Sequence, residues 1–233
     1  MSHSVHPYSH RLGIIRDWKS RWFGVNKAFR TSLKADLIIR EFLTKELRSF
    51  YLAGVDIERN QKALRIIIKT SRPGMIIGRA GDGVTKLREK LLKLFEKKKI
   101  SLAGQELKID IEEVRNPESN AAIVALMVAE ALEKRLPFRR VLKQTLEKVL
   151  ANREVQGAKI KLSGRLGGAE MARQEDLKKG QIPLQTLRAD IDYAREKAHM
   201  TYGDIGIKVW IYKGQVFEKD LKAAAASANA NRS

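Results

Sequence analysis

Cysteine is absent from this 233-residue chain, and several other features are scarce. Without cysteine there can be no disulfide framework, thiolate zinc site or cysteine nucleophile, and the chain suits the reducing cytoplasm. The longest mostly apolar stretch, residues 121–132, is interrupted by Glu130, whereas a membrane span needs roughly 20 apolar residues. We therefore expect no membrane segment. Aromatic residues make up 6% and apolar residues 43% of the chain, as in a folded protein with a highly charged surface.

Acidic side chains are also in the minority. The chain has 46 Lys and Arg against 27 Asp and Glu, which gives a net charge of +19, and its isoelectric point is about 10.2. Such an excess of positive charge is typical of proteins that bind a large polyanion. It makes nucleic acid the first candidate partner and gives no indication of a small-molecule substrate.

The first half of the chain changes between helical and strand periodicity. Apolar residues spaced by three and four predict a helix over 33–50, and alternation with period two predicts strands at 55–58 and 64–69. After a glycine cluster, a basic amphipathic helix is expected at 84–97 and a third strand at 107–112. The predicted order is helix, strand, strand, helix, strand.

The turn at Asn116-Pro117 is the best candidate for a domain boundary, because the order of elements starts afresh after it. An alanine-rich helix over 119–135 and a second helix after Pro137 precede about four antiparallel strands. The predicted fold class is α+β. We expect an arm over 1–30, a first domain over 31–116, a second domain over 117–214, and a partly disordered tail over 215–233.

The segment Gly78-Arg79-Ala80-Gly81 follows a strand and opens the basic helix. Glycine lets the backbone approach a phosphate closely, and the N–H groups at a helix start attract anions. In this order of elements, Gly-x-x-Gly matches the phosphate clamp of a type II KH module with an α-β-β-α-β core. A glycine turn without a ligand is the alternative. A P-loop is excluded, because Val84 occupies the position of the phosphate-binding lysine, and the glycine order also fails the dinucleotide fingerprint.

A second basic cluster lies at the start of the helix after Pro137. At roughly 100° per residue, Arg139, Arg140 and Lys143 share one face, while the apolar residues of the helix lie on another arc. Such a face suits the closely spaced phosphates of a nucleic acid strand, although a merely solvated face is the alternative. Lys159, Lys161 and Arg165 likewise project from one side of a strand.

Groupings that would suit an enzyme are weak. Asp190 and Asp192 on one predicted strand suggest a metal-dependent nuclease, but neighbouring arginines favour surface ion pairs. His3, His6 and His10 lie in a terminal arm with no helix to fix a metal geometry. No hydrolytic triad can be built, so we predict no enzyme, catalytic residue, metal or cofactor. The aromatic residues Trp18, Trp22, Phe23 and Phe29 are expected to pack against the first domain.

Several runs of residues resemble one family in order along the chain. They are His6-Pro7, Arg11-Leu12-Gly13-Ile14, Trp22-Phe23, Leu43-Thr44-Lys45-Glu46-Leu47, Arg72-Pro73-Gly74, Glu113-Val114-Arg115, Phe138-Arg139-Arg140, Ser163-Gly164-Arg165-Leu166-Gly167-Gly168-Ala169-Glu170, Thr186-Leu187-Arg188-Ala189-Asp190-Ile191-Asp192-Tyr193 and Thr201-Tyr202-Gly203. This set is similar to the family of bacterial-type small ribosomal subunit protein three.

The resemblance implies a structural, RNA-binding protein of the small-subunit head, with a KH domain followed by a two-helix, four-stranded antiparallel α+β domain. It implies contacts with small-subunit rRNA, with mRNA at its entry channel, and with small-subunit ribosomal proteins ten and fourteen. By position, Arg139, Arg140 and Lys143 would face incoming mRNA and help to unwind it. His6, Arg11, Lys159, Lys161, Arg165 and Arg188 would contact rRNA.

Two other functions remain open on the sequence. A free KH-type RNA chaperone or ribosome-maturation factor would share the basic cluster and the glycine loop. A nuclease would need Asp190 and Asp192 to hold a metal ion.

Overall fold

The computed structural model describes residues 6–99 and 105–217, and these form two compact units. One unit runs from Trp18 to Pro117. The other combines the described residues up to Asp17 with those from Glu118 onward. The first 30 residues are therefore divided between the two units. Most of the predicted tail over 215–233 lies outside the described residues. No helix in the described part of the chain is long and apolar enough to cross a membrane.

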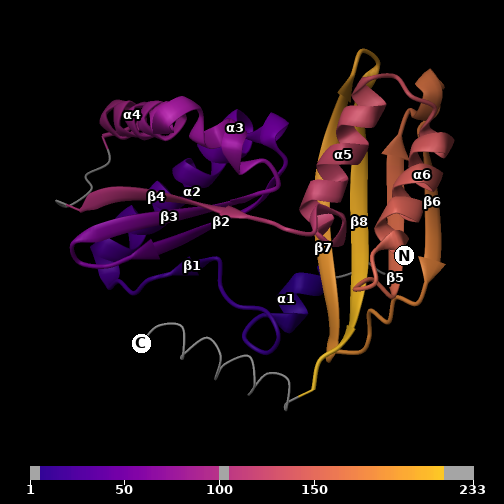
Figure 1. Cartoon of the computed structure of the whole chain (residues 1–233), viewed down its shortest axis with the longest axis horizontal. Helices are drawn as coiled ribbons and strands as arrows, with labels where there is room; N and C mark the ends of the chain where they lie inside the picture. The colour runs from indigo at the N-terminus through magenta and orange to yellow at the C-terminus, as the bar shows by residue number, and fades with distance from the viewer. Residues whose placement is uncertain (1–5, 100–104, 218–233) are drawn as a thin grey trace. The chain divides into compact units, whose positions relative to one another are not determined.

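The unit Trp18–Pro117 contains a four-stranded mixed sheet in the order β1-β2-β3-β4. Its elements are β1 (Ser20–Arg21), α2 (Asn26–Glu46), η1 (Arg48–Phe50), β2 (Leu52–Arg59), β3 (Ala63–Thr70), α3 (Pro73–Ile77), η2 (Arg79–Gly81), α4 (Asp82–Lys97) and β4 (Glu106–Glu113). β1 pairs with β2 in parallel, β2 with β3 antiparallel, and β3 with β4 in parallel. Figure 1 shows this sheet with α3 and α4 above it.

The two long helices α2 and α4 pack on the same face of this sheet. Ile39 and Leu43 of α2, spaced by four, join Leu87, Leu91 and Phe95 of α4 in one core with the apolar side chains of β2, β3 and β4. This spacing places each set on one helix face, as the sequence predicted. The predicted α-β-β-α-β order is confirmed.

β1 and the early start of α2 were not expected from the sequence. The segment is held by the Asp36 carboxylate, which accepts hydrogen bonds from Trp22 Nε1 at 2.7 Å and Ser20 Oγ at 3.2 Å. The Arg59 guanidinium donates to the same carboxylate at 2.6 Å, and both side chains are less than a tenth exposed. Trp22 packs against Phe29 of α2, whereas Phe23 is 91% exposed. Only part of the aromatic group therefore packs as predicted.

The other unit contains a four-stranded antiparallel sheet in the order β6-β5-β8-β7. Its elements are α1 (Pro7–Arg11), α5 (Ala121–Glu133), α6 (Phe138–Ala151), β5 (Gly157–Gly164), η4 (Leu166–Gly168), β6 (Arg173–Gly180), β7 (Ala189–Met200) and β8 (Gly203–Gln215), with η3 (Pro117–Ser119) at its border. α5 lies across β7 and β8, and α6 lies across β5 and β6 (Figure 1). The predicted two-helix, four-stranded antiparallel domain is confirmed.

The core of this unit lies between the two helices and one face of the sheet. α5 is almost wholly apolar and buries eight residues, while α6 buries Val141, Leu142, Leu146 and Val149. The amino end of α5 is capped twice: the Asn120 side chain accepts from the N–H of Ala122, and the Asp192 carboxylate accepts from the N–H of Ala121 at 2.8 Å. These caps satisfy N–H groups that the helix itself leaves unpaired.

Residues 6–17 contact a segment that lies far along the sequence, residues 184–189. The guanidinium of Arg11 is buried and donates hydrogen bonds to four backbone carbonyl oxygens: those of Pro7 at 2.9 Å, Leu184 at 3.2 Å, Thr186 at 2.9 Å and Ala189 at 2.6 Å. Burial lowers the pKa of this guanidinium, an effect that the nearby Asp190 opposes. The contacts fix the short helix α1 to the segment that leads into β7.

Candidate nucleic-acid interface

The Gly-x-x-Gly segment joins α3 to α4. Gly78 has φ 69° and ψ −170°, and Gly81 has φ 83°, values that glycine adopts without the steric penalty of a side chain. The residues Arg79–Gly81 form a short 3₁₀ turn, and α4 begins at Asp82. No described side chain caps this helix, and the N–H of its first residue, Asp82, donates to the backbone carbonyl oxygen of Arg79.

A third glycine, Gly83, sets how closely α4 approaches α3. A Cβ atom at this position would lie 2.2 Å from the carbonyl oxygen of Ile76 and 2.9 Å from that of Ile77. No side chain fits there, because the first turn of α4 rests directly on the backbone of α3. This packing role of Gly83 follows from the structure and could not be read from the sequence.

The charges around this loop partly cancel. Arg79 is exposed, whereas the ammonium of Lys86 lies 2.6 Å from the carboxylate of Asp82 in the first turn of α4. This hydrogen bond and the charge of Asp82 raise the pKa of Lys86. The acidic side chain lowers the positive potential beside the helix start, so Arg79 is the exposed cation of the loop.

The basic cluster of the second unit lies on α6. Arg139, Arg140 and Lys143 are all exposed, while Leu142 and Leu146 of the same helix are buried. Arg139 Nε is 3.5 Å from a carboxylate oxygen of Glu175 on β6, and its side chain is 76% exposed. Pairs this exposed contribute little to stability, so Arg139 remains available to another anion.

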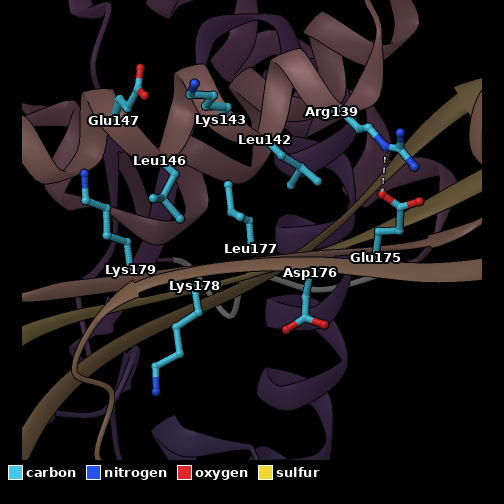
Figure 2. A pocket seen from close by; sticks show the side chains of 10 residues that line it. All are labelled: Arg139, Leu142, Lys143, Leu146, Glu147, Glu175, Asp176, Leu177, Lys178 and Lys179. Carbon is cyan, nitrogen blue, oxygen red and sulfur yellow. Dashed lines mark ion pairs between the residues drawn. The ribbon is translucent and has the colours of Figure 1, made fainter.

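A groove of about 500 Å³ runs between α6 and the edge strand β6. Figure 2 shows Arg139 and Lys143 above it on α6, with Glu175, Leu177 and Lys179 pointing toward the helix from β6. Leu142, Leu146 and Leu177 form its apolar part. The charged part of its lining carries both signs: Glu147, Glu175 and Asp176 lie beside Arg139, Lys143, Lys178 and Lys179.

The sequence did not identify the β6 side of this groove. Glu175 lies 3.5 Å from Arg139 and 3.4 Å from Arg173, and both guanidinium groups lie over the ring of Phe138, at 5.6 and 5.4 Å from its centre. β6 is polar on both faces apart from Leu177, so it lacks the alternation that reveals a strand. In the sequence, β6 is marked only as a polar segment between two turns that contain glycine.

Lys159 and Lys161 lie on β5, on the face of the sheet that α5 and α6 leave open, because they alternate with the buried Ile160 and Leu162. The ammonium of Lys159 lies 2.7 Å from Asp176 and 5.9 Å from the ring centre of Trp210. The cluster on α6 and these two lysines therefore face opposite sides of the sheet. Arg165 follows β5 and donates to the carbonyl oxygens of Ala169 and Tyr202.

The prediction of rRNA contacts near the amino end needs revision at Arg11. Arg11 is 1% exposed, and its guanidinium donates hydrogen bonds to backbone carbonyl oxygens. Arg11 therefore has a structural role and is not retained as an RNA contact. His6 is exposed: its Nδ1 accepts from the N–H of Tyr8, and the centres of the His6 and Tyr193 rings lie 4.5 Å apart with their planes nearly perpendicular. Arg188 is exposed and lies over the ring of Phe217.

The candidate nuclease carboxylates have other partners. Asp190 lies 2.6 Å from Arg16, and Asp192 caps α5, with an irregularity in the β7 ladder between Asp190 and Ile191. Within the described residues no group of three or more His, Cys, Asp or Glu could hold a metal ion. His3 lies outside that part of the chain.

Two family models match the chain. The model described as "KH domain" matches residues 38–119, and the model described as "Ribosomal protein S3, C-terminal domain" matches residues 128–211.

Full-length relatives give the same result. The chain is 48% identical to "Small ribosomal subunit protein uS3" of Caldicellulosiruptor bescii over 97% of each chain. It is 45% identical to the protein of that name from Clostridium novyi, over 93% of this chain and 94% of the relative. The chain belongs to the family of small ribosomal subunit protein uS3.

Proposed function

We propose that this protein resides in the small ribosomal subunit, binds small-subunit rRNA, and guides incoming mRNA along the α6 face formed by Arg139, Arg140 and Lys143. As a member of the uS3 family it is a structural ribosomal protein and not an enzyme, which confirms that prediction. The observation that carries the mRNA role is the exposure of all three cations beside the α6–β6 groove.

Several features support the two parts of this proposal. The three cations lie on one rigid helix, so the phosphates of a passing strand would meet them in a fixed geometry. Cations or hydrogen-bonding groups for rRNA come from His6, Lys159, Lys161, Arg165 and Arg188. The glycine loop, with Gly78, Gly81 and the exposed Arg79, is a further candidate contact with RNA. These residue roles are part of the proposal.

Protein neighbours are a further part of it. Phe29, Leu33 and Leu37 recur every four residues on α2 and are 45%, 51% and 55% exposed. Rows of exposed apolar side chains support contact with another protein. Small-subunit proteins ten and fourteen are the neighbours that we propose from the family resemblance.

The mRNA role is tested by changing Arg139→Ala together with Arg140→Ala in a cell-free translation system. The variant is expected to assemble into small subunits, seen by co-sedimentation with them on sucrose gradients at high salt. Translation of a template with a stable hairpin should slow several-fold, while an unstructured template should be translated at the wild-type rate, because only the first requires strand separation.

The matched control is Lys148→Ala with Arg153→Ala, which removes two exposed cations from the same region. Lys148 lies about 180° around α6 from Arg139. Equal rates on both templates for the Arg139 and Arg140 variant would remove the assigned mRNA role. A chain that leaves the particle as salt rises would favour the free KH-type RNA chaperone or maturation factor.

A further inference from the structure

The open face of the second sheet carries a row of three cations that come from three different strands. Lys161 of β5 is paired in register with Lys208 of β8, and Lys208 is paired with Arg195 of β7. Neighbouring strands lie about 4.8 Å apart, so the three side chains emerge side by side across three strands. Lys208 and Arg195 are exposed, and Lys161 is half-buried.

None of these three cations forms an ion pair within residues 6–99 and 105–217. Asp176 lies opposite Lys161 on β6, but its carboxylate pairs with the ammonium of Lys159, at 2.7 Å. Like charges directly opposite each other in a sheet are unfavourable, and of the described carboxylates Asp176, at the Lys161 end of the row, is the one in register with it, while it pairs with Lys159. An anion bound from outside would relieve it.

High net charge alone does not produce such a row, as the first sheet shows. On its open face Lys69 lies 2.8 Å from Asp56 and 3.8 Å from Glu112. Arg65 pairs with Glu58 at 3.5 Å and also with Asp110. Both sheets belong to the same basic chain, yet the cations of this row in the second sheet lack the partners that the first sheet provides.

The surroundings of the row are shallow. On one side, Ser163 and Gly206 form the next pair across β5 and β8, and a Cβ at Gly206 would lie 2.9 Å from Ser163 Oγ. On the other side lie Trp210, which is 8% exposed, and Tyr193, whose ring meets His6. Cations that stand side by side on neighbouring strands are placed to contact a charged backbone, a contact that carries no base sequence information.

We propose that Lys161, Lys208 and Arg195 form a phosphate-binding row that seats the backbone of an RNA strand on the open face of the second sheet. The inference rests on the proposed rRNA binding and names the surface and the chemical group that would carry it. Regularly spaced phosphates match cations that are evenly spaced by the strands. It is separate from the α6 cluster, which lies on the covered side of the sheet.

The test is a salt titration of the full chain binding to transcribed small-subunit rRNA in a filter assay. The variant is Lys161→Gln, Lys208→Gln and Arg195→Gln. Loss of three phosphate contacts should reduce the slope of log K against log salt by about 2 to 3, and affinity near 0.1 M salt should fall about tenfold or more. Lys161→Arg, Lys208→Arg and Arg195→Lys should keep the wild-type slope.

The matched control removes the same charge from the open face of the first sheet: Arg65→Gln, Lys69→Gln and Lys108→Gln. It should change the slope by less than about 1, because those cations are already paired with carboxylates. Far-UV circular dichroism verifies that each variant is folded. An equal loss of slope in both triple variants, or no loss of slope in the Gln variant of Lys161, Lys208 and Arg195, would overturn the proposed row.

Two further arms separate this inference from the proposed function. If the wild-type chain fails to bind the rRNA at all, the rRNA part of the proposed function fails with the row. If it binds and the Gln variant binds equally well, only the row fails. Polyaspartate serves as a second probe: tighter binding to it than to RNA, lost in the Gln variant, would assign the row to an acidic protein instead.

Discussion

Each of the two sheets has one face that its long helices do not cover, and these two open faces differ in how their charges are paired. On the first sheet Arg65 and Lys69 are each shared between two carboxylates. On the second sheet Lys161, Lys208 and Arg195 stand side by side without such partners among the described residues. The net charge of +19 therefore indicates a polyanion partner, while the pairing of charges indicates which surface is free to meet it.

The N-terminal segment contributes a different element to each of the two units. It supplies β1 to the edge of the first sheet, where the strand extends the hydrogen-bond ladder. To the second it supplies α1, and His6 of this segment meets Tyr193 on the open face. One buried charged side chain holds each contact: Asp36 in the first unit and Arg11 in the second. Three pairs of substitutions test how far this comparison holds.

The largest effect is expected for Asp36→Asn. Removing the charge leaves the buried guanidinium of Arg59 without its counterion, and breaking a buried pair costs about 3–5 kcal/mol. The free energy of unfolding of the first unit is measured in urea by tryptophan fluorescence in a Trp210→Phe background, where Trp18 and Trp22 report.

Asp110→Asn is the matched control on the open face of the same sheet. Asp110 also pairs with an arginine, Arg65, but these side chains are 43% and 50% exposed. Its loss should cost less than about 1 kcal/mol. A similar cost for both variants would mean that burial does not distinguish the two pairs.

Arg11→Met should have the next largest effect. Methionine keeps much of the side-chain volume but donates no hydrogen bond, so four carbonyl oxygens lose their donor, at a cost of about 2–4 kcal/mol. Fluorescence of Trp210 in a Trp18→Phe, Trp22→Phe background reports the second unit.

Arg16→Met gives the control for the same segment. Arg16 pairs with Asp190, but both side chains are more than a fifth exposed, so the cost should be about 1 kcal/mol or less. An Arg11→Met variant as stable as the Arg16→Met variant would contradict the assignment of Arg11 as the anchor of residues 6–17.

The smallest effect compares the two open faces directly. Lys208→Glu places a carboxylate between Lys161 and Arg195 and should stabilise the second unit by about 0.5 kcal/mol. Arg65→Glu brings a carboxylate beside Glu58 and Asp110 and should destabilise the first unit by a similar amount. Both changes should shrink in about 1 M salt, where charges are screened. The same sign for both variants would remove the contrast between the faces.

The parts of the fold that depend on local periodicity could be predicted from the sequence. Buried residues recur at every second position at Val55 and Ile57 of β2 and at Leu64, Ile66 and Ile68 of β3, and α6 repeats its buried residues about every three or four positions. The cationic face of α6 was predictable for the same reason, since Arg139 and Lys143 lie one turn apart on a single helix.

Features that depend on distant partners could not be predicted. The burial of Arg11 arises from carbonyl oxygens more than 170 residues away, and an arginine in an arm is indistinguishable in sequence from an exposed one. The row Lys161, Lys208 and Arg195 requires the register of three strands, which alternation alone does not fix. Helix α2 begins at Asn26 because Phe29 meets Trp22, a tertiary contact that precedes the periodic part of the helix.

The anchoring of residues 6–17 affects the order in which the two units can fold during synthesis. The hydrogen bond from Arg11 to Ala189 closes a loop of 178 residues, whereas the whole of the unit Trp18–Pro117 lies within that loop. The first unit can therefore complete its contacts while the second is still being translated, because domains fold as units as they emerge. Residues 6–17 can reach their anchoring site only after the segment that leads into β7 has been synthesised. A fragment that begins at Glu118 would lack Arg11, which donates hydrogen bonds to the carbonyl oxygens of that segment.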